Sequence, residues 1–370
     1  MAVAGAASPS AIERFRRRFP ALHPSHFRPL QHLWASSIGL GTYLGDADDQ
    51  TDALYAEAIR AALAHGCNVL DTAINYRCQR SERVIGLTLE ALCAEGLISR
   101  EEVIVCTKGG YLPFDQEVPP DPARYLARTV IEAGLARAED IVDGCHCLAP
   151  PYIDHALAAS LANLRVHTID VYYLHNPEQQ LDCVDPDAFF RTMEQAFALL
   201  EQRARDGVLR WYGAATWNGF RCHPQAKGYL SLERLVEIAA RAGGAQHHFR
   251  AIQLPYNLAM PEACSFRNQT VQGEPMTILQ AAERLGLSVI ISASLLQSRL
   301  TRLSASFETY IPGLTTSAQR AVQFVRSTPG VTTALVGMKQ AAHVEENLAL
   351  ARQPLLAPDA VSRLFDRSKR

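Results

Sequence analysis

Three apolar segments of this sequence end in ionisable residues whose types suit proton transfer. These residues are Asp71 after residues 67–70, Lys108 after residues 103–106 and His175 after residues 169–174. Tyr76 lies five residues beyond Asp71, in the loop that follows the first of these segments. Brought together in a half-buried cavity, these four side chains would strongly shift one another's pKa values.

The chemistry that this set can perform is specific. A phenol with a pKa of about 10 is a poor acid at neutral pH. A neighbouring Lys108, held charged by Asp71, is expected to lower the pKa of Tyr76 so that Tyr76 protonates a carbonyl oxygen. His175 would donate a hydrogen bond to the same oxygen. None of these groups can deliver a hydride, so a cofactor must. Singly, each residue also fits a structural role, such as Asp71 capping a turn; their joint placement favours catalysis.

The elements that must position these residues alternate regularly. Eight short runs predict strands, and six of them are almost unbroken apolar sequence, as in parallel strands buried on both faces. The runs are 36–40, 67–70, 103–106, 169–174, 211–215, 251–254, 288–291 and 333–336. Helical patterns separate them, which predicts a barrel or a doubly wound sheet. We expect residues 1–34 to form an N-terminal arm and residues 35–370 a single domain that ends in a helix and tail.

Three connections are long for a compact domain and therefore indicate binding loops or lids. One runs from Lys108 to a helix near Tyr152, and the others cover residues 256–275 and 295–315. All three follow predicted strands, so in a barrel they would lie at its C-terminal face, where strand-end side chains also converge.

Composition narrows the class of protein. A net charge of -2 over 370 residues argues against a nucleic-acid surface, and no apolar run approaches the roughly 20 residues of a membrane span. Nine scattered cysteines favour free thiols and a cytoplasmic location. Five arginines in residues 1–45 also fit an organellar transit peptide, which stays open beside a surface arm. No second Cys/His pair follows Cys145-His146-Cys147 at zinc spacing, so we expect no metal.

Four motifs in order resemble those of the aldo-keto reductase family. Asp71-Thr72-Ala73-Ile74-Asn75-Tyr76, with Ser81-Glu82 and Gly86 behind it, is similar to the D-x-A-x-x-Y signature. The other motifs are Cys106-Thr107-Lys108, Asp170-Val171-Tyr172-Tyr173-Leu174-His175-Asn176-Pro177, and the segment from Val336-Gly337-Met338-Lys339 to Val344-Glu345-Glu346-Asn347-Leu348. The resemblance covers roughly residues 35–350.

The resemblance implies a (β/α)8 TIM barrel with long loops at the C-terminal face and a nicotinamide cofactor lying across its mouth. The spacing from Gly39 and Gly41 to Gly45 agrees, since it misses the G-x-G-x-x-G dinucleotide fingerprint by one residue. The implied catalytic tetrad is Asp71, Tyr76, Lys108 and His175. Implied cofactor-binding residues are Gly41, Thr42, Asp71, Thr216 and Gln253 at the nicotinamide side, Ser292, Leu295 and Gly337, and Lys339, His343, Glu346 and Asn347 around the adenosine half.

Some positions depart from the family pattern. Ala215-Thr216-Trp217 stands where the family has Ser-Asn after the fifth strand, and Ser292 replaces a tyrosine that often stacks on the nicotinamide. Without that aromatic ring, the site loses about 0.5–1.5 kcal/mol of stacking energy beyond the energy of area burial. Lys339 near the start of the last helix would suit a 2′-phosphate, so NADP(H) is favoured, while NAD(H) stays open.

The resulting prediction is an NAD(P)H-dependent oxidoreductase that interconverts a small-molecule carbonyl and an alcohol. Tyr43, Asn176 and Trp217 are expected to line the substrate pocket. The alternative is a cofactor-binding regulatory or channel-associated protein on the same barrel, with little turnover. A short-chain dehydrogenase would need a lysine four residues after its tyrosine, where this chain has Arg80. The sequence leaves the oligomeric state open.

Overall fold

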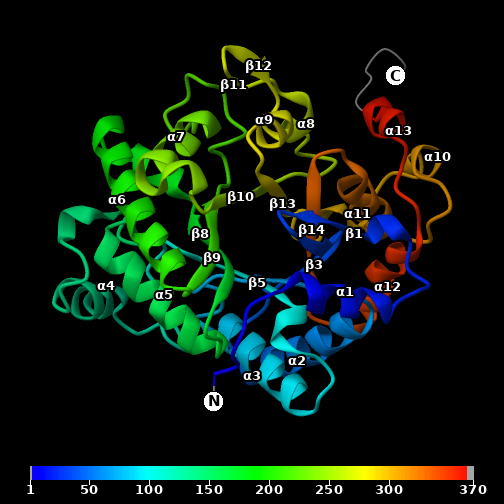
Figure 1. Cartoon of the computed structure of the whole chain (residues 1–370), viewed down its shortest axis with the longest axis horizontal. Helices are drawn as coiled ribbons and strands as arrows, with labels where there is room; N and C mark the ends of the chain where they lie inside the picture. Colours follow the sequence, from blue (N-terminus) through cyan, green and yellow to red (C-terminus); the bar gives the residue numbers. More distant parts are fainter. Residues whose placement is uncertain (1, 365–370) are drawn as a thin grey trace.

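In the computed structural model, which describes residues 2–364, eight parallel strands close into a barrel (Figure 1). The strands, in the order of the barrel, are β10 (Phe249–Pro255), β13 (Ser288–Ser292), β14 (Val331–Gly337), β3 (Ile38–Gly41), β4 (Val69–Asp71), β5 (Ile104–Gly109), β8 (Ile169–His175) and β9 (Leu209–Ala215). Each predicted strand overlaps one of these eight. The barrel is closed by pairing of β14 with β3, the last and first of its strands along the chain.

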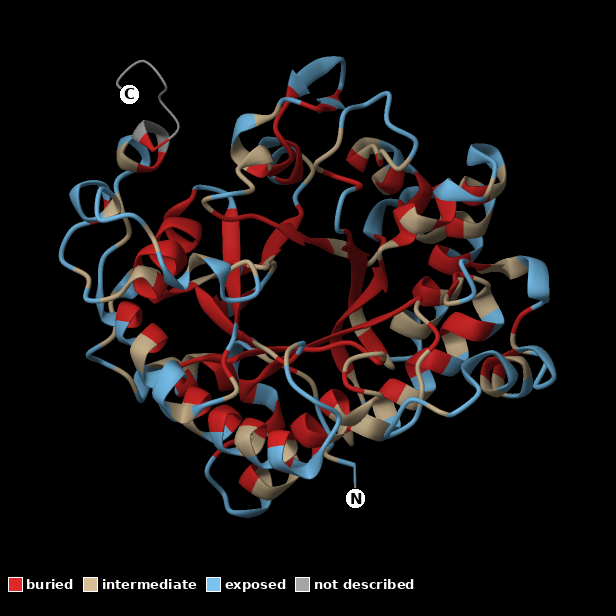
Figure 2. Cartoon of the chain, turned by 180° about the vertical axis from the view of Figure 1, so that it is seen from behind, coloured by how far each residue is buried: buried red, intermediate tan, exposed pale blue. Residues whose placement is uncertain are grey.

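Each barrel strand is followed by a helix that covers the barrel from outside. These helices are α2 (Asp49–Ala64), α3 (Arg80–Ala94), α5 (Pro150–Leu164), α6 (Pro186–Arg205), α7 (Leu232–Gly243), α9 (Ile278–Arg284), α11 (Ser317–Ser327) and α12 (Ala341–Leu348). Their inward faces are buried against the strands (Figure 2). Capping residues stabilise the N-termini of two of these helices. Asp48 accepts a hydrogen bond from Thr51 N at the start of α2, and Thr277 with Gln280 forms a capping box at the start of α9. The predicted (β/α)8 barrel is confirmed.

The N-terminal residues close the bottom of the barrel. Helix α1 (Pro9–Arg17) and a hairpin of β1 (Phe27–Leu30) and β2 (Leu33–Ser36) contribute apolar side chains to the cluster inside the barrel. The carboxylate of Asp170 ties this end together. It accepts hydrogen bonds from Ala7 N and Val105 N at 2.8 and 2.9 Å and pairs with Arg100 at 2.7 Å.

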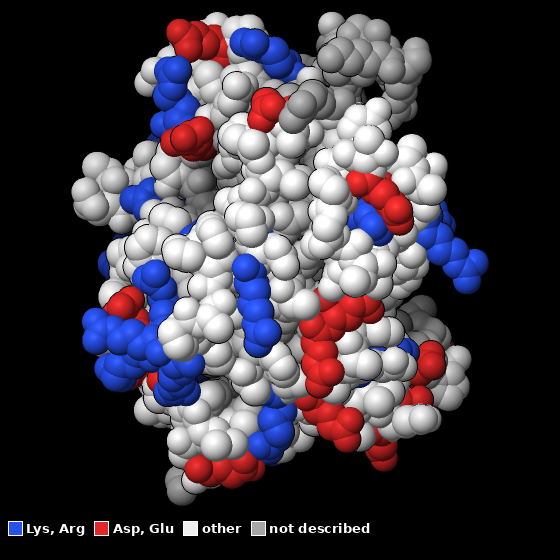
Figure 3. All heavy atoms as spheres, turned by 90° about the vertical axis from the view of Figure 1, so that its right-hand side faces the viewer, with Lys and Arg blue, Asp and Glu red and all other residues white. Residues whose placement is uncertain are grey.

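The three long connections lie beyond the C-terminal ends of their strands. The first holds α4 (Pro122–Leu126), the π-helix Ala127–Ile131, β6 (Ile141–Val142) and β7 (His146–Cys147); the second holds α8 (Glu262–Ser265), β11 (Gln269–Val271) and β12 (Glu274–Met276). The third holds a short 3-10 helix, Arg299–Thr301, and α10 (Phe307–Tyr310). The face seen in Figure 3 mixes acidic and basic side chains rather than presenting one sign. Within residues 2–364, no helix has the length and apolar character needed to span a bilayer.

Candidate active site

Asp71, Lys108 and Tyr76 meet at the C-terminal mouth of the barrel. Asp71 is the last residue of β4, and Lys108 lies near the end of the adjacent strand β5. Lys108 Nζ lies 2.5 Å from Asp71 Oδ1 and 2.7 Å from the carbonyl of Thr72, and it stands 5.1 Å from the centre of the Tyr76 ring. Asp71 and Lys108 are buried, so their charges attract each other through a medium that screens them weakly.

His175 completes this group from the end of β8. Its ring meets the Tyr76 ring edge-on, with 5.8 Å between centroids. The carbonyl of His175 accepts a hydrogen bond from His146 Nε2 at 2.7 Å, and Gln180 Nε2 donates to His146 Nδ1 at 2.9 Å. Gly110, at φ +146°, permits this approach, because a β-carbon there would lie 2.9 Å from the His175 carbonyl oxygen.

The ionisation of these groups follows from their burial and mutual charges. Burial is the largest single effect and lowers the pKa of Lys108, but the neighbouring Asp71, Tyr76 and Cys106 together outweigh it, so the pKa of Lys108 is raised and the ammonium persists. Burial, with Lys108 and His146, holds the pKa of His175 well below its usual value, so its ring is neutral. Burial raises the pKa of Tyr76, and Lys108 opposes that rise without cancelling it. The expected net lowering was therefore wrong, although Lys108 acts in the predicted direction.

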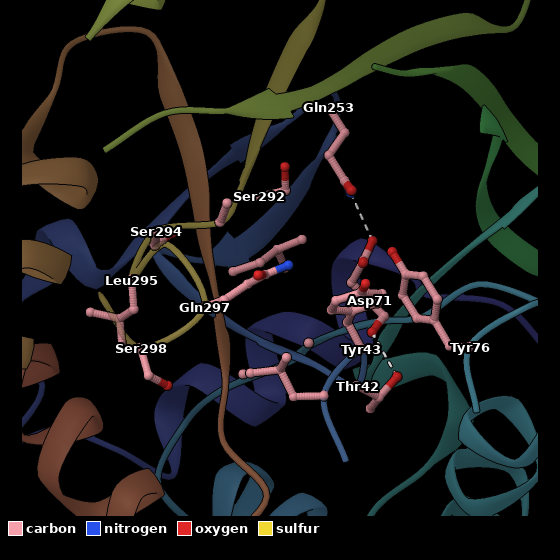
Figure 4. Close-up of a pocket in the computed structure, with 15 residues that line it drawn as sticks. Thr42, Tyr43, Asp71, Tyr76, Gln253, Ser292, Ser294, Leu295, Gln297 and Ser298 are labelled. Carbon is pink, nitrogen blue, oxygen red and sulfur yellow. Dashed lines mark hydrogen bonds between the residues drawn. The ribbon is translucent and has the colours of Figure 1, made fainter. Parts of the chain in front are cut away.

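A pocket beside this group collects the inner half of the implied cofactor-binding set. Gly41, Thr42, Asp71, Gln253, Ser292, Leu295 and Gly337 line it, together with Tyr43, Leu44, Tyr76, Ala293, Ser294, Gln297, Ser298 and Leu335. Figure 4 shows Asp71, Tyr43 and Tyr76 on one side and Ser294, Leu295 and Ser298 on the other. Gln253 Nε2 donates to Asp71 Oδ2 at 2.8 Å.

Polar atoms that suit a bound cofactor lie in this pocket and beside it. Among the described residues, Ser294 Oγ, in a residue that lines the pocket, and Thr216 Oγ1, in a residue of the adjoining cavity, are buried hydroxyl oxygens without a hydrogen-bond partner. Such groups are rare in folded proteins unless a ligand or water satisfies them. Hydroxyl and amide groups of this kind fit the carboxamide and phosphate oxygens of a nicotinamide dinucleotide.

The four residues assigned to the adenosine half lie outside the residues that line this pocket. Lys339 is half-buried and extends toward Gly45, where a β-carbon would lie 3.7 Å from Lys339 Nζ. His343 is exposed on α12, and Glu346 accepts a hydrogen bond from Thr316 Oγ1 at 2.5 Å. Asn347 Nδ2 donates to the carbonyl of His343 at 2.8 Å. Of these four side chains, Asn347 is buried, whereas Lys339, His343 and Glu346 are at least partly exposed.

A second cavity, of about 270 Å³, shares Tyr76 and Gln253 with the first and is also lined by His175. It contains all three expected substrate residues, Tyr43, Asn176 and Trp217, and also Thr216. Its other lining residues are Asn75, Tyr111, Ala215, Gln253, Ser292, Ala293 and Gln297. Within the part of the chain that the structure describes, its lining includes no Asp, Glu, Lys or Arg, so its walls are uncharged at neutral pH.

Tyr111 is a cavity residue that sequence reasoning missed. Its ring packs edge-on against both His175 and His146, at 4.9 and 5.0 Å, and Asn176 Nδ2 donates to its hydroxyl at 3.0 Å. Its position three residues after Lys108 was the available signal, but it lies in a loop whose path depends on distant contacts, including Tyr152 donating to its carbonyl.

Glu178 binds the backbone of the segment that contributes Trp217 to the second cavity. One of its carboxylate oxygens accepts from the backbone N–H groups of Trp217, Asn218 and Gly219 at 2.7, 2.9 and 3.2 Å. The side chain of Glu178 is itself buried. It fixes the segment that brings Trp217 to the cavity.

The residues that trail the tyrosine motif secure the strand ends. Ser81 Oγ donates to the carbonyl of Thr42 at 2.8 Å, and Glu82 accepts from Thr107 Oγ1 at 2.6 Å. Gly86 lets α3 touch α5, because a β-carbon there would lie 2.4 Å from the carbonyl oxygen of Asn163. The motif therefore places its neighbours as well as Tyr76.

Comparison with known proteins agrees with this geometry. The model of the aldo/keto reductase family matches residues 37–240, more than half of the chain. The chain belongs to the aldo/keto reductase family.

Among curated relatives, a 6-dehydroglucose reductase of Novosphingobium aromaticivorans is 34% identical over 141 residues, which is 36% of this chain and 44% of that protein. An NADH-specific methylglyoxal reductase of Escherichia coli is 29% identical over 188 residues, 49% of this chain and 48% of that protein. These matches span less than half of either relative. A solved aldo/keto reductase from Klebsiella pneumoniae, in complex with NADP and acetate, shares the fold with a TM-score of 0.61 and 20% identity over 92% of this chain and 94% of that one.

Proposed function

We propose that this protein is an NAD(P)H-dependent reductase that interconverts a small carbonyl compound and its alcohol, with Tyr76 as the proton donor. One observation carries the proposal: Asp71, Lys108, Tyr76 and His175 converge where the pocket beside Asp71 meets the uncharged cavity. Membership of the reductase family supports it.

Each catalytic residue has a distinct role in this mechanism. Neutral His175 donates a hydrogen bond to the substrate oxygen and aims it at Tyr76. The Tyr76 hydroxyl transfers its proton to that oxygen, and Lys108 stabilises the phenolate that remains. Asp71 holds Lys108 charged and in place. A bound nicotinamide supplies the hydride that no side chain can provide.

Cofactor-holding roles divide between the pocket beside Asp71 and the start of α12, which lies outside it. Thr216 and Gln253 would hold the nicotinamide carboxamide, with Gly41, Thr42, Ser292, Leu295 and Gly337 along the pocket. Lys339 and His343 would meet a 2′-phosphate, with Glu346 and Asn347 near the adenosine. We propose NADP(H), supported by the half-buried Lys339 at the start of α12; one relative's name specifies NADH, so NAD(H) is the alternative.

The substrate proposed is a small neutral aldehyde, ketone or sugar bound between Tyr43, Asn176 and Trp217. The uncharged walls support this choice, since a carboxylate substrate would lack a cationic partner there. The names of both curated relatives also denote carbonyl reduction. We further propose a cytoplasmic protein, a location supported by its nine free cysteines, with residues 1–34 packed as an arm on a single barrel domain.

The test is a panel of aldehydes, ketones and sugars offered with NADPH and with NADH, followed by loss of reduced-cofactor absorbance. Turnover of neutral carbonyls that Tyr76→Phe abolishes is the expected result. Tight cofactor binding without turnover of any compound would instead favour the regulatory alternative.

A further inference from the structure

The loop between β3 and α2 is exposed, yet its backbone is fastened at alternate residues. The carbonyls of Thr42, Leu44, Asp46 and Asp48 each accept a hydrogen bond from a side chain outside the loop. Residues 42–44 of this loop, with Gly41 at the end of β3, form one wall of the pocket beside Asp71. The fastening therefore determines the shape of that wall.

Arg77 supplies two of these four bonds. Its Nε donates to the carbonyl of Asp46 at 2.7 Å and its Nη2 to the carbonyl of Asp48 at 3.2 Å. The same Nη2 pairs with Asp52 at 2.6 Å, and the guanidinium stacks over Tyr55 at 5.4 Å from the ring centre. The Arg77 side chain is only 1% exposed although the loop that it holds is at the surface.

The backbone of Arg77 adopts a conformation that is energetically unfavourable for a residue with a β-carbon. Its φ is +49°, and Cys78 and Gln79 follow at +53° and +70°. A residue with a β-carbon is disfavoured in this left-handed region, and such strain gathers where the surrounding structure enforces it. Here the left-handed turn begins directly after Tyr76 and directs the Arg77 side chain back under the β3–α2 loop.

We propose that Arg77 is a positioning residue that locks the cofactor-side loop to the turn following Tyr76, so that the cofactor and the proton donor keep a fixed spacing. The Tyr43 ring, which extends from this loop and packs edge-on against Tyr76 at 5.0 Å, is the contact through which loosening would reach the tyrosine. The proposal rests on the proposed function, because it takes this pocket as the cofactor site.

The experiment compares Arg77→Gly, Arg77→Lys and the matched control Arg80→Gln. Glycine adopts a φ of +49° without strain, so Arg77→Gly removes the side-chain bonds while relieving the backbone. Arg80 also pairs with Asp52 but donates no bond to the loop carbonyls. The readouts are the Kd of NADPH and of NADH by quenching of tryptophan fluorescence, hydrogen exchange of residues 42–48, kcat and KM, and Tm.

We expect Arg77→Gly to keep its Tm within a few degrees, to raise the cofactor Kd about tenfold and to speed exchange in residues 42–48. Arg77→Lys keeps the charge but cannot reach both carbonyls at once. Its cofactor Kd and exchange rates should therefore lie between those of Arg77→Gly and of the wild type. In Arg80→Gln, the cofactor Kd and the exchange rates of residues 42–48 should stay within about twofold of the wild-type values. Unchanged Kd and exchange in both Arg77 variants, or equal loosening in Arg80→Gln, would overturn the proposal. So would a lower Tm in both Arg77 variants with unaltered Kd, which would assign Arg77 to folding alone.

Failure of the proposed function has a different signature. If the wild-type protein bound neither cofactor, the reductase assignment would fall. Exchange of residues 42–48 would still decide whether Arg77 holds the loop, because it is measured without ligand or turnover.

Discussion

Gln253 donates a hydrogen bond from Nε2 to Asp71 Oδ2, the carboxylate oxygen that Lys108 leaves free. Both oxygens of the Asp71 carboxylate are therefore engaged, one from β5 and the other from β10. Gln253 also lines the pocket proposed for the cofactor. A ligand that takes the Gln253 N–H now donated to Asp71 would leave one Asp71 oxygen without this partner and so act on the Asp71–Lys108 pair.

Replacing Tyr76 with phenylalanine should lower carbonyl reduction by at least about a hundredfold, the low end for general acid catalysis. The ring contacts with Tyr43 and His175 do not involve the hydroxyl, so cofactor affinity should persist. Steady-state turnover and cofactor Kd check both parts. Near-normal turnover would contradict the role of Tyr76.

Lys108→Met should be more damaging than Asp71→Asn. Without Lys108, nothing offsets the effect of burial, so the pKa of Tyr76 rises further. In Asp71→Asn the lysine remains, and Gln253 can turn its amide to accept from the new Asn side chain.

The pH profile of alcohol oxidation measures this effect, since Tyr76 must then accept a proton. Its midpoint should move to higher pH in Lys108→Met, because a raised pKa keeps the phenol protonated longer. Greater loss of activity in Asp71→Asn would reverse the proposed order of roles.

Lys339→Ala should weaken NADPH binding about tenfold, or about 1.4 kcal/mol, and hardly alter NADH binding. The ammonium is half-buried beside Gly45, where a charge-assisted bond to phosphate contributes more than an exposed pair. Dissociation constants at two salt concentrations test this, with the adjacent exposed Gln340→Ala as control. Added salt should erode the preference for NADPH. An equal loss of affinity for NADPH and for NADH would show that Lys339 has a structural role and does not bind the 2′-phosphate.

His26 should make the fold sensitive to acid. Burial, together with Arg326 and Arg28, lowers the pKa of His26 to about 3, against 6.5 for the free side chain. Its contribution to stability is thus complete above pH 6.5 and declines as pH falls toward 3, because the unfolded chain takes up a proton that the native protein refuses.

The slope is about 1.4 kcal/mol per pH unit for one proton. Between pH 7 and 5, the free energy of unfolding should therefore fall about 2 kcal/mol less in His26→Gln than in the wild type. Denaturant titrations at both pH values measure this, with exposed His65→Gln as the matched control. Equal pH dependence in wild type and His26→Gln would refute it.

The barrel could be predicted because its strands are local apolar runs of sequence. The residues at which the strands end could be predicted less accurately. Residues 103–106 were expected as a strand, yet β5 continues to Gly109, since pairing with β8 carries the ladder through Thr107 and Lys108. The four candidate catalytic residues could be identified because each stands at or just beyond a strand end.

What sequence spacing could not reveal depends on contacts between distant segments. Asp170 belongs to the same motif as His175, but at about 3.3 Å per residue the two lie at opposite ends of β8, so Asp170 serves the bottom of the barrel. Arg77 gives no local sign of its left-handed backbone. Tyr111 reaches the cavity only because His146, Asn176 and Tyr152 hold it there.

The pairing of β14 with β3 also sets an order of events during synthesis. Gly337 and Gly41 are register partners, and both line the pocket beside Asp71. The pocket thus lies across the junction where the barrel closes, and it cannot form until β14 has left the ribosome. Until then, the edges of β3 and β14 are unpaired and exposed to association with other chains. A dinucleotide bound across this junction would contact both strands and so stabilise the closed barrel relative to partly open forms.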